Sequence, residues 1–198
     1  MSDSSDNNMK LKLKRGMDIF LALGVLGLVC IPMVLVALAV AFTSRGPILY
    51  WSSRVGRNNT LFQMPKFRTM RTDTPAVATH LLTNPADYLT PIGSFLRKSS
   101  LDELPQLWSI FQGNMSFVGP RPALFNQQDL IALRTQYGIE RLVPGLTGWA
   151  QINGRDELPI PQKVAFDLEY LQRQSLRFDI KIIFLTFLKV IRRDNVVH

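Results

Sequence analysis

The sequence has one cysteine and two histidines among its 198 residues. A single thiol cannot form an intramolecular disulfide, so the fold is not a disulfide scaffold, and a lone cysteine suits a reducing compartment. The Cys/His spacing of a zinc site is missing as well, and so are the glycine-rich patterns of P-loop and dinucleotide-binding proteins. The usual zinc sites and nucleotide-binding folds are therefore excluded.

Acidic residues are also scarce. The 15 aspartates and glutamates are outnumbered by 23 lysines and arginines, which gives a net charge of +8. This excess indicates a polyanionic partner: a nucleic acid, an anionic membrane or a phosphorylated substrate. The hydrophobic fraction of 46% excludes an intrinsically disordered chain, and the 12 glycines and 12 prolines exclude a coiled coil. The length predicts one domain with a core of its own.

The longest apolar run lies near the N-terminus. Residues 19–42 contain no charged residue and are interrupted only by two glycines and Pro32. As a helix, at about 1.5 Å per residue, this run would extend roughly 36 Å, enough to cross a hydrocarbon core of about 30 Å. Basic residues precede and follow it, and no acidic residue occurs between residues 19 and 72. The run predicts a membrane segment with positively charged flanks.

Three interpretations of this segment are open. A cleaved signal peptide would explain the basic start, although its apolar region usually has about 7–15 residues. A simple spanning helix fits the length, but basic residues at both ends give the positive-inside rule no direction. In a re-entrant hairpin, Pro32 bends the helix and both ends stay on the cytoplasmic side. We favour the re-entrant hairpin, because it places both basic flanks on one side.

The rest of the chain predicts an α+β fold that is mostly helical. Residues 1–12 are expected to be a disordered tail, residues 13–43 the membrane helix, and residues 44–198 a small cytosolic domain. Alternation of β-type residues predicts a hairpin over residues 46–70, and a proline-rich surface loop follows over residues 72–91. Helices are expected at residues 99–112, 123–137, 161–174 and 178–193. The last of these is basic and rich in aromatic residues, which is typical of a helix lying in the membrane interface.

The most informative motif is the sequence SSLDELPQ at residues 99–106, which contains the adjacent acids Asp102 and Glu103. In a structural interpretation, Ser100 and Glu103 form a capping box, and acids are favoured at the start of a helix. In a functional interpretation, nearby cations such as Arg97 and the helix N-terminus keep a carboxylate ionised. An ionised aspartate can act as a nucleophile or a metal ligand. The motif alone leaves both interpretations open.

A second motif places Arg121 between two prolines. Pro120 and Pro122 fix φ on either side of the arginine and remove two backbone donors, so the guanidinium is presented from a stiff, extended turn. In a structural interpretation, this motif is an ordinary rigid loop. A preorganised arginine, however, is well suited to bidentate phosphate binding.

Two further motifs add positive charge. A glycine-rich loop at residues 144–148 is followed by Arg155, and alternation over residues 66–70 places Lys66 and Arg68 on one face of a strand. Each pattern alone also fits an ordinary turn or a solvated edge strand. Together with the acids, these cations indicate a site for a doubly phosphorylated substrate and a divalent cation. Nucleic acid is the less favoured partner, because the positive residues flank an apolar membrane segment.

Four motifs follow the apolar segment in order: KFRTM at residues 66–70, SSLDELPQLW at 99–108, NMSFVGPRP at 114–122 and PGLTGWAQINGR at 144–155. In this arrangement the chain resembles the bacterial sugar transferase family, and more narrowly its minimal monotopic polyprenol-phosphate phosphoglycosyl transferases. The resemblance runs from about residue 13 to residue 190. It implies a re-entrant membrane helix and a small catalytic domain with short strands and interfacial amphipathic helices. It also implies that this domain faces the cytoplasm at the bacterial inner membrane.

The resemblance implies a reaction as well. Such enzymes transfer a phospho-sugar from a UDP-sugar to polyprenol phosphate and release UMP, which is the first membrane step of glycoconjugate synthesis. The family's catalytic dyad falls on Asp102 and Glu103. Asp102 would form a phosphosugar-aspartyl intermediate, Glu103 would assist with the metal or a proton, and the pair would hold Mg²⁺. Anionic lipid headgroups would be partners of the basic flanks. The positions that would bind substrate are Lys66, Arg68, Arg97, Pro120, Arg121, Pro122 and Arg155.

Three positions depart from the family's pattern. Asn114 stands where the third motif commonly has an acid, and Asp156 replaces an asparagine after Gly-Arg; both concern sugar or loop details. Ile31 precedes Pro32 where many relatives have serine, whose hydroxyl could satisfy the carbonyl that the proline leaves free. Family habit suggests an N-acetylated hexosamine as the sugar.

Two functions of other classes are the alternatives. A non-enzymatic membrane-surface scaffold would depend neither on Asp102 nor on a divalent cation. A nucleic-acid binder would bind any duplex in a salt-sensitive manner without lipid. Release of UMP from a UDP-sugar in the presence of polyprenol phosphate and Mg²⁺ separates the three.

Overall fold

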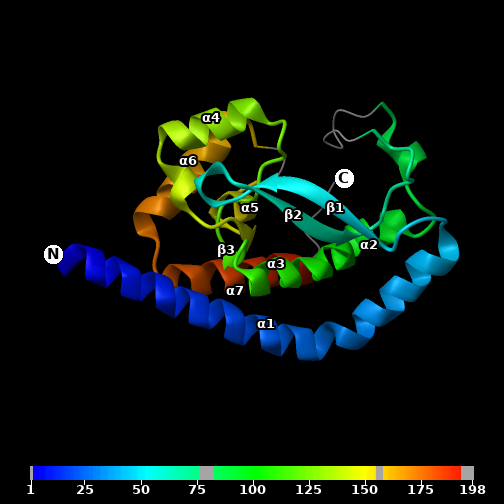
Figure 1. The fold of residues 1–198 in the computed structure, drawn as a ribbon, viewed down its shortest axis with the longest axis horizontal. Coiled ribbons are helices and arrows are strands. Elements are labelled where there is room, and N and C mark those ends of the chain that lie inside the picture. Colours follow the sequence, from blue (N-terminus) through cyan, green and yellow to red (C-terminus); the bar gives the residue numbers. More distant parts are fainter. Residues whose placement is uncertain (1, 76–82, 155–157, 193–198) are drawn as a thin grey trace.

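The structure is a computed structural model that describes residues 2–75, 83–154 and 158–192. It is mostly helical with a few short strands, as the sequence predicts (Figure 1). The first half of the described chain comprises α1 (Ser2–Thr43), β1 (Leu49–Val55), η1 (Arg57–Asn59), β2 (Leu61–Phe67), η3 (Pro85–Tyr88), α2 (Gly93–Ser99), η4 (Leu101–Gln106) and α3 (Leu107–Gln112). The second half comprises β3 (Ser116–Val118), α4 (Gln128–Gln136), η5 (Ile139–Arg141), β4 (Gly145–Thr147), α5 (Trp149–Ile152), α6 (Ile160–Arg173) and α7 (Leu176–Arg192).

The N-terminal helix α1 is long and largely uncovered. It begins at Ser2, so helix runs through residues 2–12, where the sequence predicts a disordered tail. Its portion Leu11–Thr43 is long and apolar enough to cross a membrane. Only 11% of its most apolar 18-residue stretch is buried. The helix is continuous but bends past its middle (Figure 1), in keeping with the removal of a backbone hydrogen bond by Pro32. The element is thus one bent helix, and its re-entrant arrangement in a membrane stays a prediction.

The hairpin of β1 and β2 is antiparallel and confirms the prediction over residues 46–70. Val55 pairs with Leu61, and η1 lies in the turn between them. Asn58 and Asn59 both have positive φ there, a conformation that asparagine tolerates better than most residues. The turn chemistry was therefore visible in the sequence.

The strands β3 and β4 form a short parallel pair, in which Ser116 pairs with Gly145. A Cβ atom on Gly145 would lie 2.1 Å from the backbone nitrogen of Gly119, and one on Gly148 would lie 2.1 Å from the carbonyl oxygen of Gly119. The glycines of the 144–148 motif therefore allow two backbones to approach closely. Their role here is to place the turn that follows β3.

The predicted helix over residues 99–112 is wrong in detail. Ser100 has a φ of 57°, which ends α2, and the chain resumes as η4 and then α3 up to Gln112. The side chain of Ser100 forms no capping hydrogen bond, so the capping box does not form. Elsewhere α4 begins at Gln128, five residues later than predicted, while α6 and α7 lie close to the predicted ranges.

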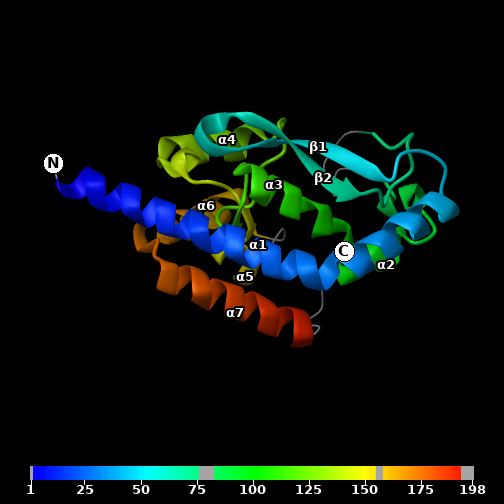
Figure 2. The ribbon, with the colours of Figure 1, turned by 60° about the horizontal axis from the view of Figure 1, so that its bottom comes forward.

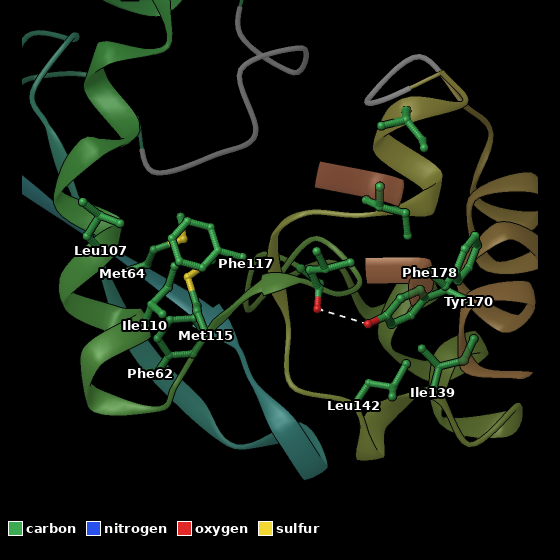
Figure 3. Packing of buried hydrophobic residues seen from close by; sticks show 14 of the residues in the cluster. Phe62, Met64, Leu107, Ile110, Met115, Phe117, Ile139, Leu142, Tyr170 and Phe178 are labelled. Carbon is green, nitrogen blue, oxygen red and sulfur yellow. Dashed lines mark hydrogen bonds between the residues drawn. The ribbon is translucent and has the colours of Figure 1, made fainter. Parts of the chain in front are cut away.

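Two groups of buried apolar side chains form the core. The larger group joins α1, the hairpin and the helices that follow; in Figure 3, Met115 and Phe117 lie on one side of it and Ile139 and Tyr170 on the other. The smaller group lies between the end of α1, β2 and α2, and its buried members are Val36, Val40, Phe67 and Leu96. Because α1 contributes to both groups, the apolar helix is an integral part of the fold.

A buried polar network fastens the first half of α1 to the domain. Lys14 Nζ lies 2.6 Å from Asp179 Oδ2 and 3.0 Å from the carbonyl oxygen of Val118. The Tyr170 hydroxyl lies 2.7 Å from Asp179 Oδ1 and 3.3 Å from the same carbonyl, the contact dashed in Figure 3. This network joins α1, β3, α6 and α7.

Helices α1 and α7 run along the same side of the molecule in both views (Figures 1 and 2). Each keeps large apolar side chains in contact with solvent. On α7 these are Ile180, Phe184, Phe187 and Val190, and on α1 the most exposed are Phe20, Leu28, Ile31 and Phe42. This side of the molecule is apolar, whereas the hairpin lies on the other side.

Candidate active site

The two adjacent acids lie in the first turn of η4, beneath the hairpin. Asp102 is 7% exposed, and η4 packs against β2. Leu101 and Leu104, which flank the acids, pack against the smaller core group. The break at Ser100 turns the chain so that apolar side chains of η4 enter the core while its acids face a cluster of cations. The position of the dyad is thus fixed by the burial of its neighbours.

Glu103 is held by two cations from distant parts of the chain. Lys66 Nζ of β2 donates to Glu103 Oε1 at 2.8 Å, and Arg121 Nη2 donates to the same oxygen at 3.3 Å. All three side chains are at least about three-quarters buried. Charge-assisted hydrogen bonds of this kind are strong and orient both partners. The structure therefore brings together the KFRTM, SSLDELPQLW and NMSFVGPRP motifs.

The charge state of Asp102 reflects a balance of opposing effects. Burial raises the pKa of Asp102 above its ordinary value, and the neighbouring charge of Glu103 acts in the same direction. The nearby cations Lys66 and Arg97 lower the pKa and offset part of this effect. The sequence prediction that cations keep this carboxylate ionised thus accounts for one side of the balance and omits burial.

Arg97 approaches the site from the last turn of α2. Its Nε donates to Thr69 Oγ1 at 3.0 Å, and its guanidinium interacts electrostatically with Asp102. Thr69 lies just after β2 and is itself buried. The pair positions one more cation beside the dyad, and Thr69 was not among the predicted site residues.

Arg68 lies elsewhere. It is 5% exposed, and its guanidinium donates to the carbonyl oxygens of Ser44 and Arg45 and to the hydroxyl of Ser44. These carbonyls follow the last turn of α1, so Arg68 satisfies backbone groups that the end of a helix leaves without partners. The structure does not bring Arg68 to the dyad, although it was predicted to bind substrate with Lys66. Arg155, another predicted substrate-binding residue, lies outside the described residues.

Pro120 and Pro122 flank Arg121 as predicted, and the turn that they form is anchored to the rest of the fold. The carbonyl oxygen of Pro120 accepts from the backbone N–H of Gly145 at 2.9 Å. The carbonyl oxygen of Pro122 accepts from Arg54 Nη1 at 3.2 Å. Arg121 therefore extends toward Glu103 from a fixed backbone.

The donor set fits Mg²⁺. Within the described residues there is no group of three or more His, Cys, Asp or Glu side chains placed to hold a metal. Asp102 and Glu103 are instead a pair of hard oxygen donors. Mg²⁺ commonly binds through one or two carboxylates and completes its coordination with water and substrate phosphates. The dyad could hold Mg²⁺ in this way together with a phosphorylated substrate.

The sequence profile of bacterial sugar transferases matches residues 9–193, which include every element described above except the first residues of α1. The chain belongs to the bacterial sugar transferase family. The four motifs that carried the resemblance in the sequence all fall within the matched range.

Named members of the bacterial sugar transferase family are similar to this chain along most of its length. It is 42% identical over 185 residues to the UDP-glucose:undecaprenyl-phosphate glucose-1-phosphate transferase of Escherichia coli strain K12, covering 89% of this chain and 40% of that protein. It is 43% identical over 172 residues to an undecaprenyl-phosphate glucose phosphotransferase of Komagataeibacter xylinus, covering 81% of this chain and 32% of that protein. The exopolysaccharide production protein ExoY of Sinorhizobium fredii is 38% identical over 190 residues, covering 87% of this chain and 83% of ExoY. The chain thus spans two fifths or less of the first two relatives and most of the third.

Proposed function

We propose that this chain transfers a sugar phosphate from a UDP-sugar to polyprenol phosphate at the cytoplasmic face of the bacterial inner membrane and releases UMP. The observation that carries the proposal is the buried Asp102 beside Lys66, Glu103 and Arg97 in a chain of the bacterial sugar transferase family. The names of the relatives support it, because several are transferases that use undecaprenyl phosphate. The reaction would be the first membrane step in the synthesis of a polysaccharide or other glycoconjugate.

The reaction proceeds in two displacements. A carboxylate oxygen of Asp102 attacks the β-phosphorus of the donor; the new O–P bond forms as the phosphoanhydride bond to UMP breaks, and UMP leaves with that electron pair. A phosphate oxygen of polyprenol phosphate then attacks the same phosphorus, and the Asp102 carboxylate is released. Two polyanionic substrates repel each other, and a covalent intermediate allows each to be bound in turn.

The cations around the dyad neutralise the phosphate charge during both steps. Arg121 and Lys66 converge on Glu103, and both cations would bind phosphate oxygens through charge-assisted hydrogen bonds when the donor is bound. Arg97 interacts electrostatically with Asp102 and would act on the same phosphates, while the Pro120–Pro122 turn would lie toward the uridine. Preorganised positive charge at the reacting phosphorus stabilises the transition state. When bound, Mg²⁺ would supply further neutralisation of the diphosphate, with Asp102 and Glu103 as its protein ligands.

A hexose without an N-acetyl group is the proposed sugar. The names of five similar relatives specify glucose or galactose, which favours UDP-glucose or UDP-galactose over the N-acetylated donor suggested by family habit. A panel of these UDP-sugars with UDP-N-acetylglucosamine tests this choice through the relative kcat/KM values.

The geometry of α1 supports a re-entrant membrane helix. Its N-terminal part is tied to the domain through Lys14 and Asp179, and its C-terminal end is tied to the same domain through Ser44 and Arg68. A helix whose two ends bind one globular body does not place those ends on opposite sides of a bilayer. Both ends of α1 rise toward the hairpin while the bend points away from it (Figure 1). The bend of α1 would enter the lipid. The exposed apolar side of α7 would lie in the membrane interface, where Lys181 and Lys189 would meet anionic headgroups.

The purified protein, assayed with UDP-glucose or UDP-galactose, polyprenol phosphate and Mg²⁺, tests the proposal directly. Release of UMP that requires the lipid and is abolished by Asp102→Asn is the expected result. Wild-type protein that remains bound to membranes or binds duplex DNA but releases no UMP with any donor would contradict it.

A further inference from the structure

The backbone carbonyl of Arg121 has an unusual partner. It accepts a hydrogen bond from Arg134 Nη1 at 2.8 Å, a side chain of α4 that is 8% exposed. Two prolines flank Arg121 in the chain, and neither supplies an N–H, so this stretch cannot pair as an ordinary strand. Donors from other elements must therefore satisfy its carbonyls. The donor to the carbonyl of Arg121 is thus Arg134, which is itself a buried charged side chain.

Arg134 is oriented by a second buried charge. Its Nε and Nη2 donate to Asp167 Oδ2 of α6 at 3.0 and 2.7 Å, and Asp167 is 1% exposed. Because the guanidinium is planar, two donors committed to Asp167 fix the direction of the third, which is the one that reaches Arg121. Contacts therefore run continuously from Asp167 through Arg134 and the Arg121 backbone to the Arg121 side chain, which donates to Glu103.

Stability alone does not explain this pair. Burial raises the pKa of Asp167, and the Arg134 guanidinium opposes this effect. Buried ion pairs can often be replaced by apolar side chains of similar volume without loss of stability. The feature that apolar side chains would not reproduce here is the hydrogen bond to the carbonyl of Arg121.

We propose that Arg134, oriented by Asp167, is a positioning residue that directs the guanidinium of Arg121 toward Glu103 and the donor phosphates. The inference rests on the proposed function for the identity of that ligand. A displacement of about 1 Å at a reacting group can cost on the order of 100-fold in rate. Arg134 thus acts on the reaction only through Arg121.

A double-mutant cycle with Arg121 separates positioning from a structural role. Arg134→Met combined with Asp167→Leu removes both buried charges and preserves most of the packing. We expect a Tm close to that of the wild type and a loss of about 10- to 100-fold in kcat/KM for the UDP-sugar. In an Arg121→Ala background, the same paired replacement should change kcat/KM by less than about twofold, because the group that it positions is gone. An equal loss with and without Arg121, or no loss in the protein that retains Arg121, overturns the proposal.

A matched control and a second variant complete the test. Arg57 is an exposed arginine that also donates to a backbone carbonyl, that of Arg141 at 2.9 Å, and Arg57→Gln should leave kcat/KM unchanged. If the paired replacement does not fold, the double-mutant cycle is repeated with Arg134→Lys. A lysine ammonium keeps the ion pair with Asp167 but lacks the planar guanidinium that also donates to the carbonyl of Arg121. Additive losses with Arg121→Ala then overturn the inference. A wild-type protein that releases no UMP contradicts the proposed function instead, so the two failures are distinguishable.

Discussion

The proposed mechanism places two conflicting requirements on Asp102: the side chain is buried, and as the proposed nucleophile it must lose its proton. The structure meets both in part, because burial and Glu103 raise the pKa of Asp102 while Lys66 and Arg97 lower it. A carboxylate poised in this way is costly for the fold and useful for the reaction. This balance leads to a prediction about stability and one about rate.

The stability prediction concerns Asp102→Asn in metal-free protein with EDTA. A folded-state pKa above the unfolded value means that the stability contributed by this group is complete at low pH and is lost as the pH rises through the folded-state pKa. Asparagine carries no charge at any pH. The Tm of Asp102→Asn should therefore exceed that of the wild type at pH 8, and the difference should shrink as the pH falls toward the ordinary aspartate range. The exposed Asp73 gives a control, Asp73→Asn, that should show no gain; a lower Tm for Asp102→Asn at pH 8 would contradict the pKa direction.

The rate prediction concerns Lys66→Met. Lys66 contacts Glu103 and interacts with Asp102, so its loss removes preorganised positive charge at the reacting phosphorus. We expect kcat/KM for the UDP-sugar to fall by about 10²- to 10³-fold. Lys98→Met removes an exposed lysine only four residues from Asp102 and should change the rate by less than about twofold. Equal effects of the two variants in the UMP-release assay would mean that general positive charge, and not the Lys66 contact, matters.

Site residues could be predicted from the sequence where a motif is local. Asp102, Glu103, Lys66 and Arg121 stand in short motifs, and the structure brings these four together. Arg134 and Asp167 could not be found in this way, because they are 33 residues apart and their importance depends on a turn that neither adjoins. Lys66 and Arg68 illustrate the limit of periodicity: β2 ends at Phe67, and Arg68 turns to the end of α1.

At the scale of elements, close approach of backbones places the site. The parallel pair of β3 and β4 brings the turn after β3 against the glycine-rich loop, and Gly119, Gly145 and Gly148 leave no room for a side chain. A parallel pair of three-residue strands has too little periodicity to be recognised in the sequence. The antiparallel hairpin was predictable because its alternation and its turn are local, whereas the break at Ser100 was not, because serine seldom adopts positive φ.

Gly145→Ala tests the importance of this approach. The added Cβ would lie 2.1 Å from the Gly119 nitrogen, so one backbone must move. We expect the free energy of unfolding to fall by about 1–3 kcal/mol or more, and UMP release to fall with it as the Arg121 turn shifts. Gly27→Ala is the matched control, because a Cβ on Gly27 meets no atom within 4 Å. Chemical denaturation of both variants gives the comparison, and equal stabilities would contradict the packing argument.

At the scale of the whole molecule, the polar site and the apolar side are arranged around one long apolar helix, α1. α1 packs against both core groups, and polar contacts tie both of its ends to the domain. In the proposed function, this arrangement would let the lipid substrate reach the dyad from the bilayer. The sequence predicted a membrane segment from the length of the apolar run and a bend from Pro32. Lys14 and its partner Asp179 of α7 are far apart in the chain, so their contact could be found only in the folded structure.

The orientation of α1 is tested by labelling cysteines from one side of the membrane. In a Cys30→Ser background, Met9→Cys and Thr60→Cys introduce exposed thiols before and after the apolar segment. A re-entrant helix predicts that an impermeant maleimide labels both thiols in inside-out vesicles and neither in right-side-out vesicles. Labelling of the two thiols from opposite sides would establish a spanning helix.

The central claim, that Asp102 becomes esterified to the donor phosphorus, is tested most directly by trapping the adduct. Active protein is incubated with UDP-glucose or UDP-galactose carrying ³²P in the β-phosphate, without lipid acceptor, and then denatured and digested. The account predicts a hydroxylamine-sensitive label on the peptide that contains Asp102, absent from Asp102→Asn and discharged when polyprenol phosphate is added before denaturation. Protein that turns over donor and acceptor at a normal rate yet never acquires the label would contradict it.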